Sequence, residues 1–264
     1  VDNGSTDGTM NLARNYVNDY SNLVTCLVEE SIRNSYAARN RGISEAVGTL
    51  ISFVDANVMV GRDFLSLIAK YFEGNSVDYL GNRIELTIKK DTLSARYNKM
   101  TDFKVESDIR YNHYTPTCCL TVRSSVFDKV GIFDQRIESG GDWDFGQRTF
   151  QTKLKQNYSG DIVVYHPARS SYLSLINKGR RIARGVAQLS YYKPQEYNHL
   201  FKRYFVIRRY FPGNPFDLFH QYKSTYDDTT YLEAFIYAFF HIPIRLIAFF
   251  ALVKEKFRLT VSKK

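Results

Sequence analysis

Cysteine is scarce in this sequence of 264 residues, which has only Cys26, Cys118 and Cys119. An odd number of cysteines without a C-x-x-C spacing argues against a disulfide framework and against a zinc site, and it favours a reducing compartment. Cys118 and Cys119 open an apolar run that predicts a buried strand. We expect both to be small core residues, because nothing nearby in the sequence would lower the pKa of a thiol.

The sequence also has no initiator methionine and no stretch typical of a signal peptide. Val1 and Asp2 resemble the tail of a strand already under way, so we expect an N-terminally truncated chain. The 44% of hydrophobic residues are enough for a substantial core, which excludes a disordered protein. The length fits one large domain, or one domain with an appendage.

Acidic residues are few in the second part of the chain. Residues 1–144 contain 16 Lys and Arg against 20 Asp and Glu, whereas residues 145–264 contain 20 against 7, a net charge of +13. The whole chain holds 20 Tyr and 19 Phe. A basic, aromatic-rich region could meet nucleic acid or an anionic membrane surface.

An apolar run over residues 50–54 is followed by Asp55 and, two positions later, by Asn57. Gly48 and Gly61 bound the run, whose β-branched and aromatic residues predict a buried parallel strand. Side chains at i and i+2 of an extended segment point the same way, so both could face one Mg²⁺ or Mn²⁺ ion that carries a diphosphate. A strand-ending Asx turn is the alternative.

The segments before this run alternate between helix and strand patterns. Residues 1–9 are rich in turn formers and lead into a helical pattern over residues 10–17; residues 23–28 then predict a strand, and residues 35–46 a helix. This alternation is typical of an α/β fold with a parallel sheet. Groups of the first turn could contact a nucleotide, or residues 5–7 could simply cap the helix.

Three motifs occur in a fixed order: V-D-N-G-S-T-D-G-T over residues 1–9, A-A-R-N-R-G over residues 37–42 and F-V-D-A-N over residues 53–57. Together they resemble a family 2 glycosyltransferase with the GT-A fold, a nucleotide-diphospho-sugar transferase fold whose mainly parallel sheet is flanked by helices. The similarity runs from residue 1 to about residue 170. Family members normally begin with a further strand and helix, roughly 30 residues in a βαβ unit, which this sequence does not show.

The resemblance implies roles for residues of these motifs. Asp2 and Ser5 would contact the nucleotide, with Asp2 at the base, and Arg39 would lie near the nucleotide and the diphosphate. Asp55 and Asn57 fall on the D-x-D element that holds the ribose and a divalent metal, Mn²⁺ or Mg²⁺. Asn57 stands where Asp is usual and offers only a neutral carbonyl oxygen, so we expect weaker metal binding. A cap and a surface salt bridge are the structural alternatives for Asp2 and Arg39.

A second polar segment over residues 140–145, G-G-D-W-D-F, contains the only Trp of the sequence. The family usually has an acidic pair opening a helix here. Asp142 falls on the residue that resembles the catalytic base, with Gly141 in place of the usual Glu. Trp143 and Asp144 would lie on the acceptor side. The alternative is that Asp142 is only a helix N-cap.

Residues 162–167 predict a strand that carries His166 near its end, where the family often has a histidine near the metal or the diphosphate. A purely structural histidine is the alternative. Residues 178–185 form a basic helical pattern that could meet phosphates or headgroups, or could simply be a solvated charged face.

From about residue 195 the resemblance fades. We therefore expect a catalytic domain over residues 1–194 and a basic, aromatic-rich, helical extension over residues 195–264 that associates with the membrane. Residues 200–211 interleave cations with aromatic residues, which suits an interfacial helix.

Residues 234–253 approach the length of a membrane span but contain His241, Pro243 and Arg245. An Arg near mid-span costs about 2.5–3.5 kcal/mol on insertion scales. We expect a helix that lies on or dips into the cytoplasmic face of an anionic membrane, with Pro243 as a candidate hairpin break. A helix packed on the catalytic domain of a soluble protein is the alternative.

These patterns predict a GT-A-like enzyme that transfers a sugar from a nucleotide-sugar donor to a hydroxyl of a glycan or lipid-linked glycan. The family resemblance implies inversion, with a divalent metal at the diphosphate and Asp142 as general base. We expect no nucleic-acid partner. The alternatives are a nucleotidyltransferase acting on sugar phosphates and a non-catalytic membrane-binding module.

Overall fold

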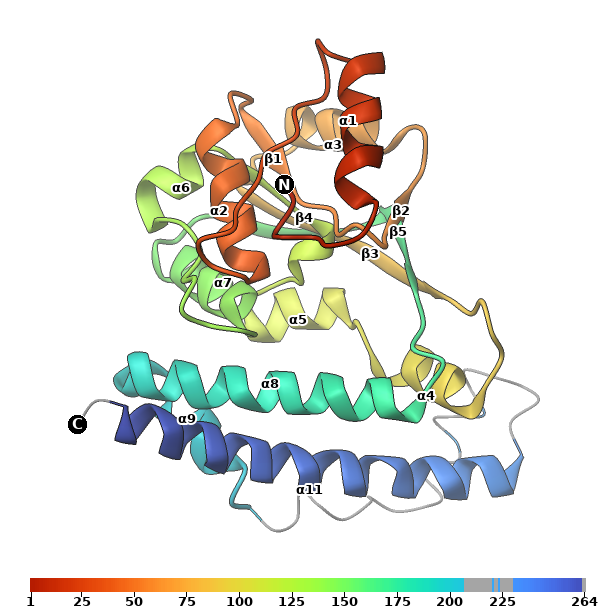
Figure 1. Cartoon of the computed structure of the whole chain (residues 1–264). Helices are drawn as coiled ribbons and strands as arrows, with labels where there is room; N and C mark the ends of the chain where they lie inside the picture. The colour runs from red at the N-terminus through yellow and green to blue at the C-terminus, as the bar shows by residue number, and fades with distance from the viewer. Residues whose placement is uncertain (207–219, 221–222, 224–229, 263–264) are drawn as a thin grey trace. The chain divides into compact units, whose positions relative to one another are not determined.

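The structure of the chain is a computed structural model, and it describes residues 1–206, 220, 223 and 230–262 (Figure 1). Its helices are α1 (Thr9–Asp19), α2 (Ser35–Glu45), α3 (Phe64–Gly74), α4 (Leu93–Thr101), α5 (Val105–Asn112), α6 (Ser125–Val130), α7 (Gly141–Gln151), α8 (Tyr172–Tyr192), α9 (Pro194–Arg203) and α11 (Tyr231–Val261). Its strands are β1 (Leu50–Ser52), β2 (Met59–Val60), β3 (Tyr79–Thr87), β4 (Leu120–Arg123) and β5 (Gln156–Pro167).

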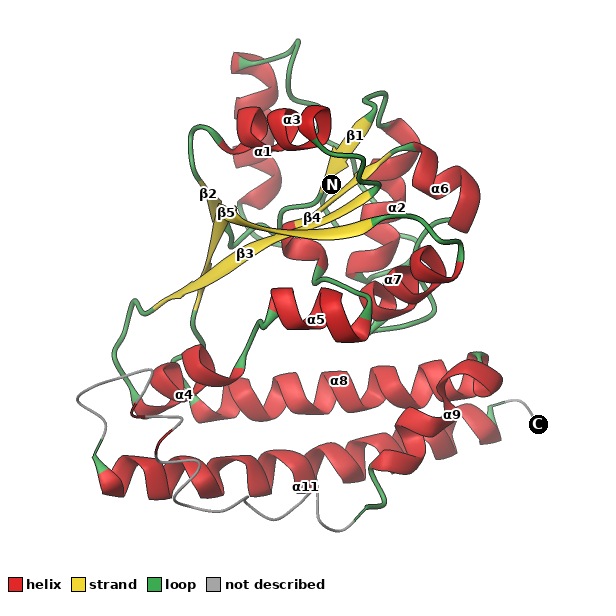
Figure 2. Cartoon of the chain, turned by 180° about the vertical axis from the view of Figure 1, so that it is seen from behind, coloured by secondary structure: helices red, strands yellow, loops and turns green. Residues whose placement is uncertain are grey.

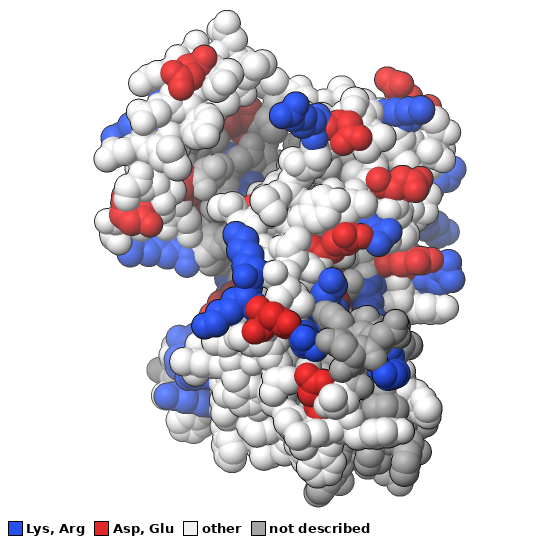
Figure 3. Space-filling model, turned by 90° about the vertical axis from the view of Figure 1, so that its right-hand side faces the viewer, with Lys and Arg blue, Asp and Glu red and all other residues white. Residues whose placement is uncertain are grey.

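The chain divides into two compact units, which we describe separately. Unit 1 comprises Val1–Ala56, Gly61–Arg83 and Val105–Val163, and unit 2 comprises Asn57–Val60, Ile84–Lys104 and Val164–Lys264. On the face drawn in Figure 3, acidic and basic side chains are interspersed. The predicted division of the chain at residue 194 stays a prediction.

The strands of the described residues form one sheet in the order β1-β4-β3-β5-β2. The pairs β1–β4, β3–β4 and β2–β5 run antiparallel. A mixed α/β sheet with flanking helices is thus confirmed, whereas parallel pairing is confirmed only in part, by an isolated parallel bridge between Asp2 and Val28. The predicted strand over residues 23–28 is reduced to this bridge.

The expected parallel, buried strand over residues 50–54 is wrong in its direction and in its burial. Leu50 pairs with Arg123 and Ser52 with Thr121 in antiparallel register, and the three residues of β1 are only partly buried. The reason is that β1 lies at the end of the sheet order and has β4 as its neighbour. An apolar run favours a strand but carries no information about which partner it meets.

The core of unit 1 lies between the sheet and the helices on one of its faces. Figure 2 shows α5 and α7 on that face and α3 on the other. Buried side chains of α2, the sheet, α6, α7 and the loop between α6 and α7 form one cluster: Tyr36, Tyr79, Leu120, Val122, Val126, Phe133 and Phe145. Full burial of a large apolar side chain stabilises the fold by about 1.5–3 kcal/mol, so this cluster fixes α2 and α7 against the sheet.

The adjacent cysteines are core residues, as predicted. Cys118 and Cys119 are free thiols and are buried. The hydrogen bond with Cys119 and burial raise the pKa of Cys118 far above its usual range, so this thiol stays protonated and unreactive.

Three helices of unit 2 pack together. Ala183 and Ala187 of α8 meet Ala248 and Leu252 of α11 in one buried cluster, to which Tyr204 after α9 contributes. The small residues let the two helices approach closely: a Cβ at Gly179 would lie 2.8 Å from Cγ2 of Ile244. Figures 1 and 2 show α8 and α11 side by side.

The predicted hairpin break at Pro243 is wrong, because α11 is one helix that runs through Pro243 to Val261. Contacts with α8 on both sides of the proline explain this continuity. The hydroxyl of Tyr172 donates to the carbonyl of Phe240 at 2.6 Å, and Ile244 packs against Gly179. Tertiary packing thus offsets the local cost of a proline in a helix, which is about 3 kcal/mol.

Gly146 tests the packing of α7 against the residues that follow α5 in unit 1. A Cβ there would lie 2.5 Å from the carbonyl oxygen of His113 and 2.6 Å from Cβ of Tyr114. Since a backbone oxygen cannot move aside cheaply, Gly146→Ala should destabilise the protein by about 1–3 kcal/mol in urea unfolding. Gly74→Ala at the end of α3 is the control, because no atom lies within 4 Å of its Cβ position. Equal stability of the two variants would contradict this packing.

Candidate active site

Helix α2 is fixed by asparagine side chains at its N-terminus and at its middle. Oδ1 of Asn34 accepts the N–H groups of Tyr36 and Ala37 at 2.9 and 2.8 Å, which caps the helix. Asn40 is buried; its Nδ2 donates to the carbonyl of Phe133 at 2.8 Å, and its Oδ1 accepts the N–H of Phe133 at 3.0 Å. The asparagine of the A-A-R-N-R-G motif, to which sequence analysis gave no role, therefore ties α2 to the loop before α7.

The hydroxyl of Tyr36 lies at the first turn of α7. It accepts the N–H of Gly141 at 2.9 Å and that of Asp142 at 3.4 Å, and it donates to Oδ1 of Asp142 at 3.4 Å. Burial and the charge of Asp142 raise the pKa of Tyr36 well above 10, so the hydroxyl keeps its proton. Sequence analysis missed this residue, because nothing in its local pattern indicates a partner 106 positions away.

The close approach of Tyr36 also explains Gly141, which stands where the family usually has Glu. A Cβ at Gly141 would lie 2.8 Å from Cζ of Tyr36. A larger residue would therefore displace the tyrosine ring.

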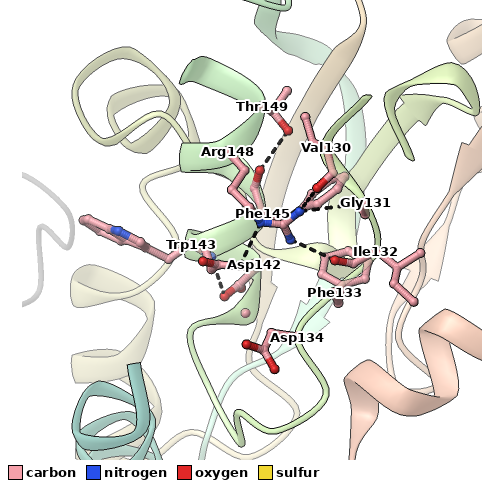
Figure 4. A network of polar contacts seen from close by, with 12 residues as sticks. Val130, Gly131, Ile132, Phe133, Asp134, Asp142, Trp143, Phe145, Arg148 and Thr149 are labelled. Atoms are coloured by element: carbon pink, nitrogen blue, oxygen red, sulfur yellow. Dashed lines mark hydrogen bonds and ion pairs between the residues drawn. The ribbon is translucent and has the colours of Figure 1, made fainter. Parts of the chain in front are cut away.

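Asp142 is not the N-cap of α7, so this alternative is wrong. Gly140 occupies that position with φ 91°, and the Tyr36 hydroxyl accepts the exposed N–H groups instead. The half-buried carboxylate of Asp142 lies in the first turn, where its Oδ1 accepts the N–H of Trp143 at 3.0 Å (Figure 4). The partial positive charge of a helix N-terminus favours a carboxylate there.

Asp144 faces a different environment. Its side chain is 1% exposed, and its Oδ2 accepts a hydrogen bond from Nε of Arg148 at 3.0 Å. Arg148 also donates to carbonyls of the loop after α6, including that of Ile132 at 2.8 Å, and Figure 4 shows Trp143 pointing away from this cluster. Asp142 and Asp144 are two positions apart on α7, so their side chains point in directions about 200° apart around the helix axis. The acceptor-side role of Asp144 stays a prediction, and its burial does not favour it; that of Trp143 also stays a prediction.

Arg39 and Asp55 form an ion pair within unit 1. Nη2 of Arg39 lies 2.7 Å from Oδ1 of Asp55, and the two side chains are 15% and 40% exposed. The guanidinium also lies over the ring of Tyr36, 5.4 Å from its centre. Contacts made by α2 therefore connect the carboxylate after β1 with the carboxylate of Asp142.

Asn57 and His166 lie together within unit 2. Nδ2 of Asn57 is 3.4 Å from Nε2 of His166, and Nδ1 of His166 is 2.9 Å from the carbonyl oxygen of Pro167. A carbonyl can only accept, so Nδ1 of the neutral ring carries the hydrogen and Nε2 carries the lone pair. Turning the Asn57 amide would place its oxygen beside Nε2, which gives one oxygen and one nitrogen donor for a cation.

The predicted metal ligands are a carboxylate, an amide and an imidazole, which are ligand types that Mn²⁺ accepts. Among the residues that the structure describes, no group of three or more His, Cys, Asp or Glu could hold a metal. The predicted set of Asp55, Asn57 and His166 contains only two residues of these types, so it depends on the amide oxygen of Asn57. Carboxylate, amide and imidazole ligands suit Mn²⁺ better than a soft metal.

Asp2 closes the first turn of the chain. Its Oδ2 accepts the N–H groups of Gly4 at 3.0 Å and Ser5 at 2.9 Å, and hydrogen bonds from the side chain and backbone of Ser5 lower the pKa of Asp2. It does not cap α1, whose N-cap is Gly8. Asn3, which sequence analysis did not single out, holds this turn by donating to the carbonyls of Glu29 and Ile32. Nucleotide contacts of Asp2 and Ser5 stay predictions.

Tyr36→Phe tests the link between α2 and the start of α7. The change leaves the N–H of Gly141 without its acceptor and removes the donor to Asp142, so we expect a stability loss of about 1–3 kcal/mol and a lower kcat with an unchanged KM. Tyr79→Phe is the matched control, since the buried Tyr79 hydroxyl accepts the N–H of Thr115 at 2.8 Å. That variant should lose stability but keep kcat. Equal effects on kcat would show that Tyr36 is only structural.

Comparison with known proteins relates the first part of the chain to a known family. Residues 1–131 match the family described as glycosyl transferase family 2. The chain is 32% identical over 190 residues to the glycosyltransferase AglE of Haloferax volcanii, an alignment that covers 72% of this chain and 62% of that protein. It is 26% identical over 141 residues to the pre-mycofactocin glycosyltransferase of Mycobacterium tuberculosis, covering 51% of this chain and 30% of that protein. The chain thus spans less than two thirds of the length of these relatives.

A solved structure shows the same fold. The mannosyltransferase PcManGT from Pyrobaculum calidifontis, in complex with GDP-Man and Mn²⁺, superposes with a TM-score of 0.56 at 16% identity. The superposition covers 96% of this chain and 76% of that one. The GT-A-like α/β fold expected from the sequence is confirmed.

Proposed function

We propose that the chain transfers a sugar from a nucleotide-sugar donor to a hydroxyl acceptor with inversion at the anomeric carbon, as a member of glycosyl transferase family 2, whose model its residues 1–131 match. The acceptor is a glycan or a lipid-linked glycan. The observation that carries the proposal is the position of Asp142, half-buried in the first turn of α7 beside the Tyr36 hydroxyl.

Asp142 is the general base of this reaction. The acceptor oxygen attacks the anomeric carbon while its proton passes to the Asp142 carboxylate, and the bond to the diphosphate breaks with its electron pair leaving on the diphosphate oxygen. The Tyr36 hydroxyl remains protonated and orients the carboxylate.

The donor is held by residues of the N-terminal motifs. Asp2 and Ser5 contact the nucleotide, and Arg39 supplies positive charge near the diphosphate. In the structure Arg39 pairs with Asp55, so Arg39 exchanges this partner for phosphate oxygens when the donor binds.

Asp55, Asn57 and His166 would hold a divalent ion, Mn²⁺ or Mg²⁺. The support for this set is the donor chemistry of the three side chains and the lone pair of His166 Nε2 beside Asn57. When bound, the ion neutralises charge on the leaving diphosphate.

The protein works at the cytoplasmic face of a membrane, with residues 1–194 as the catalytic domain and residues 195–264 as its attachment. Among the described residues, α11 is long and apolar enough to reach across a bilayer, and only 19% of its most apolar window is buried. An exposed apolar helix of this length supports association with lipid.

Nucleotide release tests the proposed function. The purified chain is incubated with UDP- and GDP-sugars, with Mn²⁺, Mg²⁺ or EDTA, and release of the nucleoside diphosphate is measured with and without glycan acceptors. We expect metal-dependent release from at least one donor. Release of pyrophosphate from a nucleoside triphosphate and a sugar phosphate would instead identify a nucleotidyltransferase.

A further inference from the structure

Helix α11 carries a stripe of exposed apolar side chains along its length. Its members recur at three-, four- and seven-residue intervals, which keeps them on one side of the helix; the α11 stripe comprises Leu232, Phe235, Phe239, Leu246, Phe250 and Phe257. Phe250 and Phe257 are 68% and 70% exposed. Arg245 does not interrupt the stripe, because it lies about 100° around the helix from Leu246.

The opposite side of α11 is packed against α8. Tyr237, Ala248 and Leu252 are buried on that side. Polar groups there are also satisfied within the pair: Nε2 of Gln188 in α8 donates to Oε1 of Glu255 at 2.9 Å. Among the α11 side chains that the structure describes, those of the stripe are therefore the apolar surface left for another partner.

The contacts of α8 with α11 limit the orientation that α11 can take at a bilayer. The two helices contact each other from Tyr172 and Phe240 at one end to Gln188 and Glu255 at the other. Between these contacts α8 carries four cationic residues, Lys178, Arg180, Arg181 and Arg184. If α11 crossed the bilayer, α8 would carry these charges into the hydrocarbon with it, which is costly.

We propose that α11 lies along the membrane–water interface, with the α11 stripe in the boundary between headgroups and acyl chains and α8 on the water side. The helix is about 46 Å long at 1.5 Å per residue, and its stripe is continuous, as in helices that lie flat on lipid. Lys254 and Arg258 are exposed near its C-terminal end, and residues 145–264 carry a net charge of +13. The partner is therefore an anionic lipid surface.

This inference deepens the membrane association in the proposed function and depends on neither the donor nor the base. Vesicle flotation of the full chain tests the surface. We expect the wild type to float with phosphatidylcholine vesicles that contain phosphatidylglycerol and to bind less well without the anionic lipid. High salt should weaken binding without abolishing it, because apolar contacts are not screened by salt.

The double variant Phe235→Glu/Phe250→Glu should partition at least about tenfold more weakly, since each change removes the burial of a Phe ring in lipid. Leu65→Glu is the matched control, because Leu65 is an exposed apolar residue of α3, 71% exposed. That variant should float like the wild type. Unchanged flotation of the double variant would overturn the proposal. Donor binding should be the same in all three proteins, which separates failure here from failure of the proposed function.

A second measurement separates a flat helix from a spanning one. Single cysteines replace Leu232, Leu246 or Val261 in a Cys26→Ser background, because Cys118 and Cys119 are buried. Each is labelled with the fluorophore NBD, and the protein is added to preformed vesicles. Dithionite, which does not cross the bilayer, should quench all three labels. Protection of the label at one end only would establish a span and overturn the proposal.

A dimer held by the stripe is the other outcome that overturns it. In that case the wild type should show twice the monomer mass by light scattering, fail to float, and become a monomer on Phe235→Glu/Phe250→Glu.

Discussion

Asp142→Asn should lower the transfer rate at least about 100-fold while leaving donor affinity and thermal stability unchanged. The amide keeps the shape of the carboxylate, and its Oδ1 can still accept the N–H of Trp143 and the hydroxyl of Tyr36. It cannot take a proton from the acceptor at neutral pH. Single-turnover transfer, donor titration calorimetry and a thermal melt measure the three quantities.

Asp144→Asn is the control, because it makes the same chemical change two positions away on the same helix. Asp144 is 1% exposed and pairs with Arg148, so this variant should lose about 1–3 kcal/mol of stability and keep its transfer rate at temperatures where it is folded. The opposite pattern, with Asp144→Asn the slower enzyme, would move the base from Asp142 to Asp144.

Asp55→Ala should abolish donor binding that depends on a divalent ion. Loss of an outer contact to a metal ligand already costs about 10–100-fold in affinity, so loss of the only carboxylate in the predicted set should cost at least the upper end of that range. Calorimetry with a nucleotide sugar, with Mn²⁺ or with EDTA, measures the effect. Undiminished affinity of the wild type in EDTA would rule out the metal.

Asn57→Asp is the reciprocal variant. It restores the carboxylate that the family usually has at this position and should tighten Mn²⁺ binding, because a charged oxygen replaces a neutral one. The same change also adds an acceptor beside Nε2 of His166. Weaker Mn²⁺ binding in this variant would mean that Asn57 is only a turn residue.

Local sequence patterns predicted several of the helices and strands. The helices predicted over residues 10–17 and 35–46 appear as α1 and α2. The strand predicted over residues 162–167 is the C-terminal half of β5, which begins six residues earlier, at Gln156. These patterns are short-range, since hydrophobic spacing and turn residues act within one element.

What the sequence by itself determined is therefore the resemblance to the family, the order of its motifs, and the burial of Cys118 and Cys119 in the core. The tertiary structure alone decided that β1 pairs antiparallel with β4, that α11 continues through Pro243, and that the Tyr36 hydroxyl rather than Asp142 binds the start of α7. Each of these depends on a partner distant in the chain. A local pattern reports what a segment can bury or cap, whereas its partner is selected by packing of the whole core.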